Sequence, residues 1–539
     1  MEGFDTMGTR PILKNKLYLY LTEFFAGVSV MAVELGASRL LAPYFSSSQI
    51  VWTIIIGTIM IAMALGNLWG GRMADKDPNT DRLYRRLLIA AVWIAAIPVL
   101  GKYVILGISG LLVLTVSTNF LVIAAFCACV VIFVFPLFLL GTVTPCLVKY
   151  TVDSLNDSGR TVGNLGACNT IGSILGTFLP TFVTIPAVGT AVTFLLFSGI
   201  LLVIGLVYFL SAKTKLKTCL VFLVLFLLCA VLGSGGSFAF WEKELTYEGE
   251  SVYNYLQVKE TNRRVILSTN VLFGVQSVMM KDDGLTGMYY DYALAAPVMA
   301  DLEEKTNPQI LILGNGTGTY ARQCTTYFPQ ARIEGVEIDS KITDLAYEYF
   351  DMPESVDVTT YDGRAYLQAV DKKYDVILVD AYQDITIPFQ MSSTEFFTLV
   401  RDHLAPGGVM VVNLNMHSDG EGSINQALCD TIASIFPSVC TADVPNTTNR
   451  ELFAALDGDL PQRMAENLAQ VENPALAEHL TTVAEALTPY TGGGHILTDD
   501  QAPVEVLGMR AIDGIIQEEL EYYQDVFREE GLSGLLKQF

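Results

Sequence analysis

The chain is poor in the residues that usually bind metal ions or form disulfides. It has only four histidines, which are scattered, and nine cysteines, none of which forms a CxxC pair. Paired spacing is typical of zinc sites and of disulfide frameworks, so the sequence predicts neither, and we expect no metal cofactor. The second half contains an odd number of cysteines, which favours a reducing compartment for that half: Cys324, Cys429 and Cys440.

Basic residues are scarce in the second half of the chain. Residues 1–240 contain 15 Lys and Arg against 9 Asp and Glu, whereas the remaining residues contain 18 against 47. The acidic half would repel a phosphate backbone, so we expect no nucleic-acid partner. It would attract cations, including polyamines, although an acidic surface also serves solubility alone.

Long apolar runs fill the first half, and the mean hydropathy of the chain is +0.42. We expect no cleavable signal peptide, because the first apolar run is long and others follow it. Each run is near the roughly 20 residues that a bilayer requires, so residues 1–240 are predicted to be a multi-span helical domain in the plasma (cell inner) membrane. The seven predicted spans cover about 17–42, 50–71, 87–116, 120–147, 165–186, 190–211 and 217–235.

Basic residues are almost missing from every second loop between these spans. They precede the first span and occur in the second, fourth and sixth loops, so the positive-inside rule places the N-terminus in the cytoplasm. Seven spans would then put the acidic half outside. Three solutions stay open: a helical hairpin over 87–116 that gives eight spans, a last segment that does not cross, or an external domain.

Three ionisable residues interrupt the first predicted span, namely Glu23, Glu34 and Arg39. An ionisable group inside a membrane span suggests a function, because burying it is costly. Glu34 could contact a cationic substrate, as in a transporter, or a basic neighbour. A structural polar contact is the alternative, although Glu34 and Arg39 are five residues apart and share a helix face poorly.

From residue 241 onward the pattern changes to short strands. Residues 241–300 predict a small antiparallel meander followed by a linking helix. From residue 309, apolar runs of four to six residues alternate with helical segments, which is typical of a parallel sheet covered on both faces. We therefore predict an α/β domain with a Rossmann-like sheet over 301–539, whose last part, 420–539, is a helical extension.

The stretch that organises this half is 307–322, NPQILILGNGTGTYAR. An apolar run predicts a buried strand, which ends in a turn formed by Gly314, Gly316 and Gly318 before a predicted helix. Glycine adopts positive φ and lets the backbone approach a ligand closely. A strand, a glycine turn and a helix N-terminus together favour a nucleotide-binding corner.

Acidic residues stand at the ends of the next three predicted strands. Glu337 follows Gly318 by 19 residues, close to the spacing of about 20 expected for a carboxylate that binds a ribose. Asp362 ends the third strand and Asp380 ends the fourth. A single acid of this kind is usually a helix cap or a turn former. Three of them after a glycine turn favour a ligand site at the carboxyl edge of the sheet.

These residues resemble the spermidine synthase family (polyamine aminopropyltransferases), within the wider group of S-adenosylmethionine-type methyltransferase folds. The resemblance covers about residues 250–415 and is carried by GVEID, YDGRAYL and YDVILVDAY. The whole chain resembles the membrane-fused, multi-span members through VELGASRLLAPYF, GGRMADK and HILTDDQAPVE. The resemblance implies a transferase of polyamine biosynthesis, and we expect a homo-oligomer such as a dimer.

At the nucleoside end of the site, the resemblance implies roles for each matching residue. The three turn glycines match the family's glycine turn, and Glu337 matches the acid that holds the ribose of the donor. Asp362 and Gly363 match the pair beside the adenine, and Asp380 matches the proton acceptor. The implied cosubstrate is decarboxylated S-adenosylmethionine, with S-adenosylmethionine as the alternative.

At the amine end, the resemblance implies a set of substrate-binding residues that departs from the family pattern. Gln276 and Tyr290 match family residues. Thr317 stands where the family has an aspartate that touches the amine, and Asp291 replaces a histidine. Asp384, one place late, can supply the family's second aspartate. The identity of the amine acceptor is therefore open.

The sequence thus predicts a membrane-bound aminopropyltransferase that uses a polyamine or another amine as acceptor. One alternative is an S-adenosylmethionine-dependent methyltransferase of a small molecule. Another is a polyamine transporter or sensor whose synthase-like domain only binds. The supply of a nucleoside cosubstrate favours the cytoplasmic side for the second half, against the count of seven spans.

Overall fold

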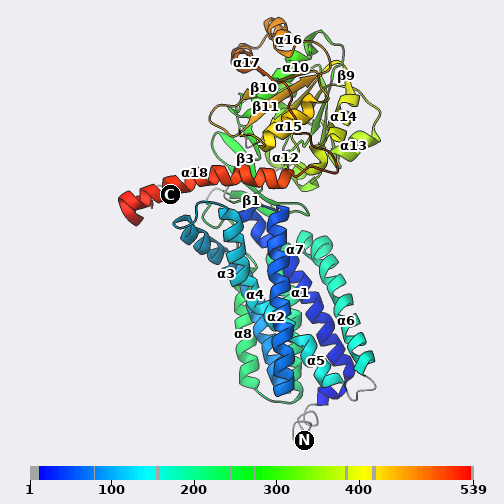
Figure 1. Cartoon of the computed structure of the whole chain (residues 1–539), viewed down its shortest axis with the longest axis vertical. Coiled ribbons are helices and arrows are strands. Elements are labelled where there is room, and N and C mark those ends of the chain that lie inside the picture. Colours follow the sequence, from blue (N-terminus) through cyan, green and yellow to red (C-terminus); the bar gives the residue numbers. More distant parts are fainter. Residues whose placement is uncertain are drawn as a thin grey trace. The chain divides into compact units, whose positions relative to one another are not determined.

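The computed structural model describes residues 11–77, 79–152, 158–242, 245–271, 274–282, 284–382, 387–415 and 420–535 (Figure 1). These residues form two compact units. One unit is built mainly from the chain up to Glu242, and the other mainly from Leu256–Glu518.

The first unit is a bundle of long apolar helices that run alongside one another (Figure 1). Six segments of the described chain are long and apolar enough to cross a membrane. One of them, 158–211, holds 54 residues, and Gly189 interrupts it with φ 78° and ψ 169°. The spans predicted over 165–186 and 190–211 both fall in this segment, on either side of Gly189. The helices are α1 (Lys16–Phe45), α2 (Gln49–Lys76), α3 (Thr80–Val113), α4 (Phe120–Gly141), α5 (Val143–Thr151), α6 (Ser158–Leu179), α7 (Ile185–Ser211) and α8 (Leu216–Gly233).

Helix α3 runs without a break across the region where a hairpin was one of the open solutions. It contains Pro98 but no turn. Lys102, a charged residue inside this helix, is only 9% exposed, and its ammonium group donates to the carbonyl of Ser237 at 2.8 Å. The eight-span solution is therefore wrong, because a buried partner lets this charge stay inside a continuous helix.

Helices α1 and α6 approach each other closely through glycines. A Cβ atom on Gly172 would overlap the carbonyl oxygen of Phe24, and one on Gly176 would overlap that of Val28. Small residues at a helix contact let two backbones pack directly, which is a common means of association in membranes.

The second unit begins with the predicted meander. Its strands are β1 (Leu245–Glu250), β2 (Tyr255–Glu260), β3 (Arg264–Ser268) and β4 (Ser277–Met280). They follow one another in the order β1-β2-β3-β4, and β3 is antiparallel to both β2 and β4.

A larger sheet carries eight strands within the described residues, in the order β12-β10-β11-β9-β8-β5-β6-β7. Strands β7, β6, β5, β8 and β9 are parallel. The chain enters at β5, moves outward to β7 and then crosses to β8, so the switch of direction lies between β5 and β8, where ligands of such sheets bind. The strands are β5 (Gln309–Leu313), β6 (Arg332–Glu337), β7 (Asp357–Thr360), β8 (Tyr374–Val379), β9 (Leu404–Leu414), β10 (Ser438–Asp443), β11 (Arg450–Ala455) and β12 (Thr488–Pro489).

Helices cover both faces of this sheet, as the uninterrupted apolar strands predict. Ile310 and Ile312 of β5 face one buried cluster, and Leu311 and Leu313 face the other. The first cluster includes residues of α9 (Tyr289–Ala293), α10 (Ala295–Met299), α11 (Thr319–Tyr327), α12 (Ser340–Tyr349), α16 (Leu460–Asn467) and α17 (Pro474–Ala486). The second includes residues of α13 (Gly363–Ala369), α14 (Thr394–His403) and α15 (Ile424–Ala433).

The predicted helical extension over 420–539 is wrong in part, because the sheet continues into it. Strand β11 pairs antiparallel with β9, and β10 pairs antiparallel with both β11 and β12. These strands complete the edge of the sheet beside β9, whose backbone groups would otherwise lack partners. Helix α18 (Val504–Leu535) then ends the described chain.

Candidate active site

The glycine turn follows β5 and holds all three glycines at positive φ, +88° at Gly314, +53° at Gly316 and +82° at Gly318. L-residues rarely adopt this conformation. A side chain at Gly314 would also overlap the carbonyl oxygen of Asp380, and one at Gly318 would overlap the sulfur of Met352. The turn therefore requires glycine for its conformation and for its close contact with the end of β8.

Glu337, the last residue of β6, is hydrogen-bonded to this turn. Its Oε2 accepts a hydrogen bond from the amide of Gly316 at 2.9 Å, and its Oε1 accepts one from the amide of Asp339 at 3.0 Å. The side chain is 6% exposed, and burial raises its pKa. Each oxygen keeps a second lone pair, so the carboxylate can still accept a hydrogen bond from a ligand hydroxyl.

Asp362 follows β7 and caps helix α13. Its Oδ1 accepts from the amide of Ala365 at 2.8 Å. This is the ordinary structural role of an acid at a helix start. Gly363 is the first residue of that helix, and a Cβ there would come within 3.3 Å of Met391. The adenine-binding role of both residues stays a prediction.

Asp380 follows β8, next to the glycine turn. Its Oδ1 accepts from Nδ2 of Asn413 at 2.9 Å, and its Oδ2 accepts from the hydroxyl of Tyr289 at 2.7 Å. Burial is the main reason that the pKa of Asp380 is raised to about 7; the two hydrogen bonds oppose the rise, and the charge of Glu337 adds to it. A carboxyl group with this pKa can take up a proton near neutral pH.

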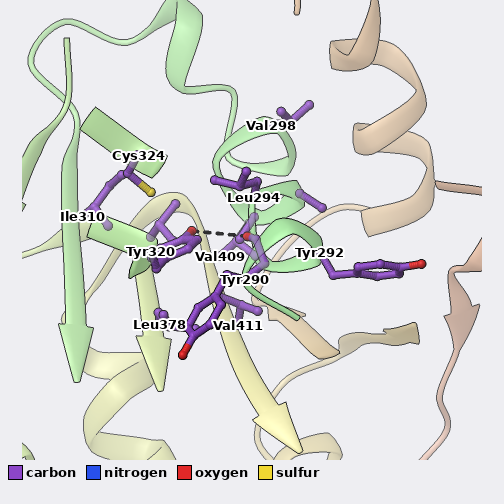
Figure 2. Close-up of a cluster of buried hydrophobic side chains, with 14 of the residues drawn as sticks. Tyr290, Tyr292, Leu294, Val298, Ile310, Tyr320, Cys324, Leu378, Val409 and Val411 are labelled. Carbon is purple, nitrogen blue, oxygen red and sulfur yellow. Dashed lines mark hydrogen bonds between the residues drawn. The ribbon is translucent and has the colours of Figure 1, made fainter. Parts of the chain in front are cut away.

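The tyrosine that contacts Asp380 is Tyr289, whereas the sequence pointed to Tyr290. The two rings lie 4.0 Å apart, and the hydroxyl of Tyr290 donates to the backbone carbonyl of Gln276 at 2.7 Å. Figure 2 shows Tyr290 in the buried cluster on this face of the sheet, close to Leu378 and Val411. Tyr290 thus holds the segment before β4, and the side chain of Gln276 is half-buried beside it.

Asp291 is buried, and its carboxylate already accepts four hydrogen bonds. The donors are the amide and hydroxyl of Thr286, the amide of Gly287 and the side-chain amide of Gln323. These four hydrogen bonds connect the segment before α9 to α11. We expect a positioning role for Asp291 rather than a contact with the amine.

Thr317 lies inside the glycine turn and is 1% exposed. Its amide donates to the hydroxyl of Ser277 at 3.3 Å, and its own hydroxyl has no hydrogen-bond partner in the described parts of the chain. Asp384 lies outside the described residues. Among those residues, no group of three or more His, Cys, Asp or Glu could hold a metal ion.

The fold thus brings the glycine turn, Glu337 and Asp380 together at the carboxyl ends of β5, β6 and β8. Sequence reasoning did not find Tyr289 or Asn413. The signal for Tyr289 was its position next to Tyr290, and Asn413 stood at the end of a predicted strand, as the three acids did.

A family model described as the spermine/spermidine synthase domain matches residues 290–456. A probable polyamine aminopropyl transferase of Bifidobacterium longum is 58% identical over 352 residues, which cover 62% of this chain and 77% of that protein. The chain belongs to the spermine/spermidine synthase family. The polyamine aminopropyltransferase of Vibrio vulnificus is 26% identical over 299 residues, which cover 52% of this chain and 96% of that protein.

Membership of this family confirms the resemblance seen in the sequence, and the protein is a transferase of the spermidine synthase type. A crystal structure of a probable spermidine synthase from Corynebacterium glutamicum is 20% identical. It covers 47% of this chain and 96% of its own, with a TM-score of 0.35.

Proposed function

We propose that this family member is a membrane-bound enzyme that transfers an aminopropyl group from decarboxylated S-adenosylmethionine to a polyamine or another amine. The observation that carries the proposal is the environment of Asp380, a buried carboxyl group with a pKa raised to about 7 that adjoins the glycine turn. An amine acceptor arrives as an ammonium ion and must lose a proton before it can attack. Asp380 is the group that accepts this proton.

The reaction forms a bond between the amine nitrogen and the aminopropyl carbon next to the sulfonium, while the bond from that carbon to sulfur breaks. Its electron pair goes to sulfur, which leaves as an uncharged thioether, and the proton goes to Asp380. The enzyme supplies alignment, which can lower such a barrier by several kcal/mol. Tyr289 and Asn413 each donate to one carboxylate oxygen and so fix its orientation.

The donor is proposed to lie along the glycine turn, with its ribose hydroxyls on Glu337. A donor that keeps its carboxylate would need a cation near its amino-acid end. Arg322 in α11, the helix that follows the glycine turn, directs its Nη1 to the carbonyl of Met280 at 3.3 Å. This arrangement favours the decarboxylated donor over S-adenosylmethionine, and with it aminopropyl transfer over methyl transfer.

The donor test uses the full chain purified in detergent. Decarboxylated S-adenosylmethionine and S-adenosylmethionine are supplied separately with 1,4-diaminobutane, and the product masses are measured. We expect an aminopropyl adduct with the first donor and no methylated product with the second. Methylation of the amine with no aminopropyl adduct would replace this proposal by a methyltransferase.

A second function, cation transport or sensing by the helical unit, is favoured by one observation. Glu23 in α1 is fully buried, and its Oε1 accepts from Thr144 at 2.6 Å and from Asn169 at 2.9 Å. Its Oε2 has no hydrogen-bond partner among the described residues. Uptake of labelled spermidine by proteoliposomes that contain the full chain would test this function, and Glu23→Gln should abolish any uptake seen.

The membrane orientation is also part of the proposal, with the basic loops and the N-terminus in the cytoplasm. If the chain reverses at Gly189, it crosses seven times, and the second unit emerges outside. The donor would then have to reach that side. Labelling of an exposed Glu472→Cys variant in whole cells tests this. Because the supply of the nucleoside cosubstrate favours the cytoplasmic side, we expect labelling only after permeabilisation, which would mean that α8 does not cross; labelling of intact cells would place the second unit outside.

A further inference from the structure

A second buried acid stands near Asp380 and has not been assigned any role. Glu451 lies in β11, one of the strands that the sequence did not predict, and is completely buried. Neither of its carboxylate oxygens has a hydrogen-bond partner in the described parts of the chain. Buried carboxyl groups almost always have partners, so such a group calls for an explanation.

Another buried acid of the same sheet shows what a structural role looks like. Glu334 in β6 is 3% exposed and accepts hydrogen bonds from Lys372, Tyr366 and Tyr374, at 2.8, 3.1 and 2.9 Å. These partners lower the pKa of Glu334 despite its burial. Glu451 has no comparable set of donors, so the fold itself gives no reason to keep an acid at this position.

The register of the strands places Glu451 in one row with the residues of the site. Val379 of β8 pairs with Val412 of β9, so Asp380 stands beside Asn413, and Asn413 pairs directly with Glu451. Side chains of paired residues point to the same face of a sheet. Two strand spacings separate the Cα atoms of Asp380 and Glu451 by roughly 10 Å.

The face that carries this row is the one covered by α9, the helix that contains Tyr289 and Tyr290. Leu378, Val411 and Phe453, each two residues from a member of the row, belong to the same buried cluster as Tyr290 and Tyr320. Figure 2 shows Leu378, Val411 and both tyrosines together, with the hydroxyl of Tyr320 donating to the carbonyl of Ala293. Glu451 therefore lies on the tyrosine side of the sheet, as Asp380 does.

The electrostatics agree with this placement. Burial raises the pKa of Glu451 well above its ordinary range, and the charge of Asp380 raises it further. Glu451 in turn contributes to the raised pKa of Tyr320, at the start of α11. Glu451 thus interacts electrostatically with both Asp380 and Tyr320.

Neither the ionised nor the neutral form of the Glu451 carboxyl group finds its hydrogen-bond partners within the described protein. The ionised form lacks donors, and the neutral form lacks an acceptor for its proton among the described residues. Asp291, the other buried acid beside the tyrosines, already accepts four hydrogen bonds. An ammonium group carries a positive charge and three N–H donors, which is what Glu451 lacks.

We propose that Glu451 is a second carboxylate of the amine site, which binds the alkylammonium group of a cationic substrate next to Asp380. The proposal rests on the proposed transfer to an amine. The ammonium could belong to the aminopropyl group of the donor or to the acceptor amine. Glu451 is a binding residue in this scheme, and Asp380 takes the proton.

The test compares Glu451→Gln and Glu451→Leu with the wild type in the full chain. The KM values for decarboxylated S-adenosylmethionine and for 1,4-diaminobutane are measured separately. A lost charge-assisted hydrogen bond predicts a rise of about ten- to hundredfold in one of the two KM values, with a much smaller change in kcat. The KM that rises identifies the source of the ammonium group.

Thermal stability separates binding from a structural role. Glu451→Leu removes an unpartnered buried acid, so its Tm should not fall and is expected to rise. The matched control is Glu334→Gln, the same kind of change at a buried acid with partners, which should lower Tm and leave both KM values unchanged. A lower Tm for both Glu451 variants, with unchanged KM values, would overturn the proposal.

Calorimetric titration with 1,4-diaminobutane separates this proposal from the proposed transfer reaction. If the wild type forms no aminopropyl product but binds the diamine more tightly than Glu451→Gln, the transfer proposal fails and the Glu451 site stands. If the wild type is active and both Glu451 variants match it in both KM values and in diamine affinity, the Glu451 site fails alone.

Discussion

The nucleoside end and the amine end of the candidate site are built in different ways. At the nucleoside end, Glu337 is the last residue of β6, and it is held by the backbone amides of Gly316 and Asp339, which lie in the turns that directly follow β5 and β6. At the amine end, Asp380 is held by the side chains of Tyr289 and Asn413, which lie 91 and 33 residues away in the chain.

This difference indicates which kinetic property each end of the site controls. Backbone donors do not change when side chains are replaced, so the nucleoside end should respond mainly to changes of backbone conformation and should affect donor binding. Side-chain donors lower the pKa of Asp380 against the effect of its burial, so the amine end should respond to single substitutions through kcat and its pH dependence.

Replacement of the proton acceptor should have the largest effect. Asp380→Asn keeps the shape of the side chain but cannot take up a proton. We expect kcat to fall about a thousandfold, within the range usual for general bases, while the donor binds as before. Steady-state kinetics and calorimetric donor binding check both parts. Full turnover by this variant would remove Asp380 from the mechanism.

A substitution in the turn tests whether the two ends are independent. Gly314→Ala places a Cβ against the carbonyl oxygen of Asp380 and forces alanine to φ +88°. We expect a combined loss of about a hundredfold, through a higher donor KM and a lower kcat together, because a misplaced catalytic group can cost this much.

The control for this substitution is Gly494→Ala, at a position where a Cβ would meet nothing within 4 Å. It should match the wild type. A Gly314→Ala variant that changed only the donor KM would show that the turn and Asp380 work separately.

The pH dependence of the wild type reports the amine end directly. Asp380 must be ionised to accept a proton, and its pKa is raised to about 7. Below that pH, kcat/KM should therefore fall about tenfold for each unit of pH, and Asp380→Asn should lose this dependence on its residual activity. A profile that stays flat from pH 7 to pH 5 would contradict the assignment.

The smallest expected effect concerns the hydroxyl of Tyr289. Its hydrogen bond to Asp380 lowers the pKa of that carboxyl group. Tyr289→Phe removes the bond, so the midpoint of the pH profile should move to higher pH, and activity at pH 7 should fall a few-fold. Tyr290→Phe, which removes a hydrogen bond to the Gln276 backbone instead, should leave the midpoint in place.

The parts of the site that the sequence revealed are those formed close together along the chain. The turn glycines, Glu337 and Asp380 are each recognisable from a strand and the few residues after it. Tyr289 and Glu451 could not be found in this way, and the position of Asn413 near a strand end did not reveal its partner, since the significance of all three lies in contacts between segments far apart in the chain. Strands β10 and β11 were missed for a related reason, because their pairing depends on an edge that only the assembled sheet presents.

The sequence by itself determined the division into an apolar helical half and an acidic α/β half, the family, and the glycine turn with its acids. These features follow from composition, periodicity and short-range backbone requirements. Only the tertiary structure decided that α3 is one continuous helix, that Tyr289 rather than Tyr290 contacts Asp380, and that Glu451 is buried without a partner among the described residues. Each of these depends on which distant segments meet, and burial and pairing are properties of the folded chain.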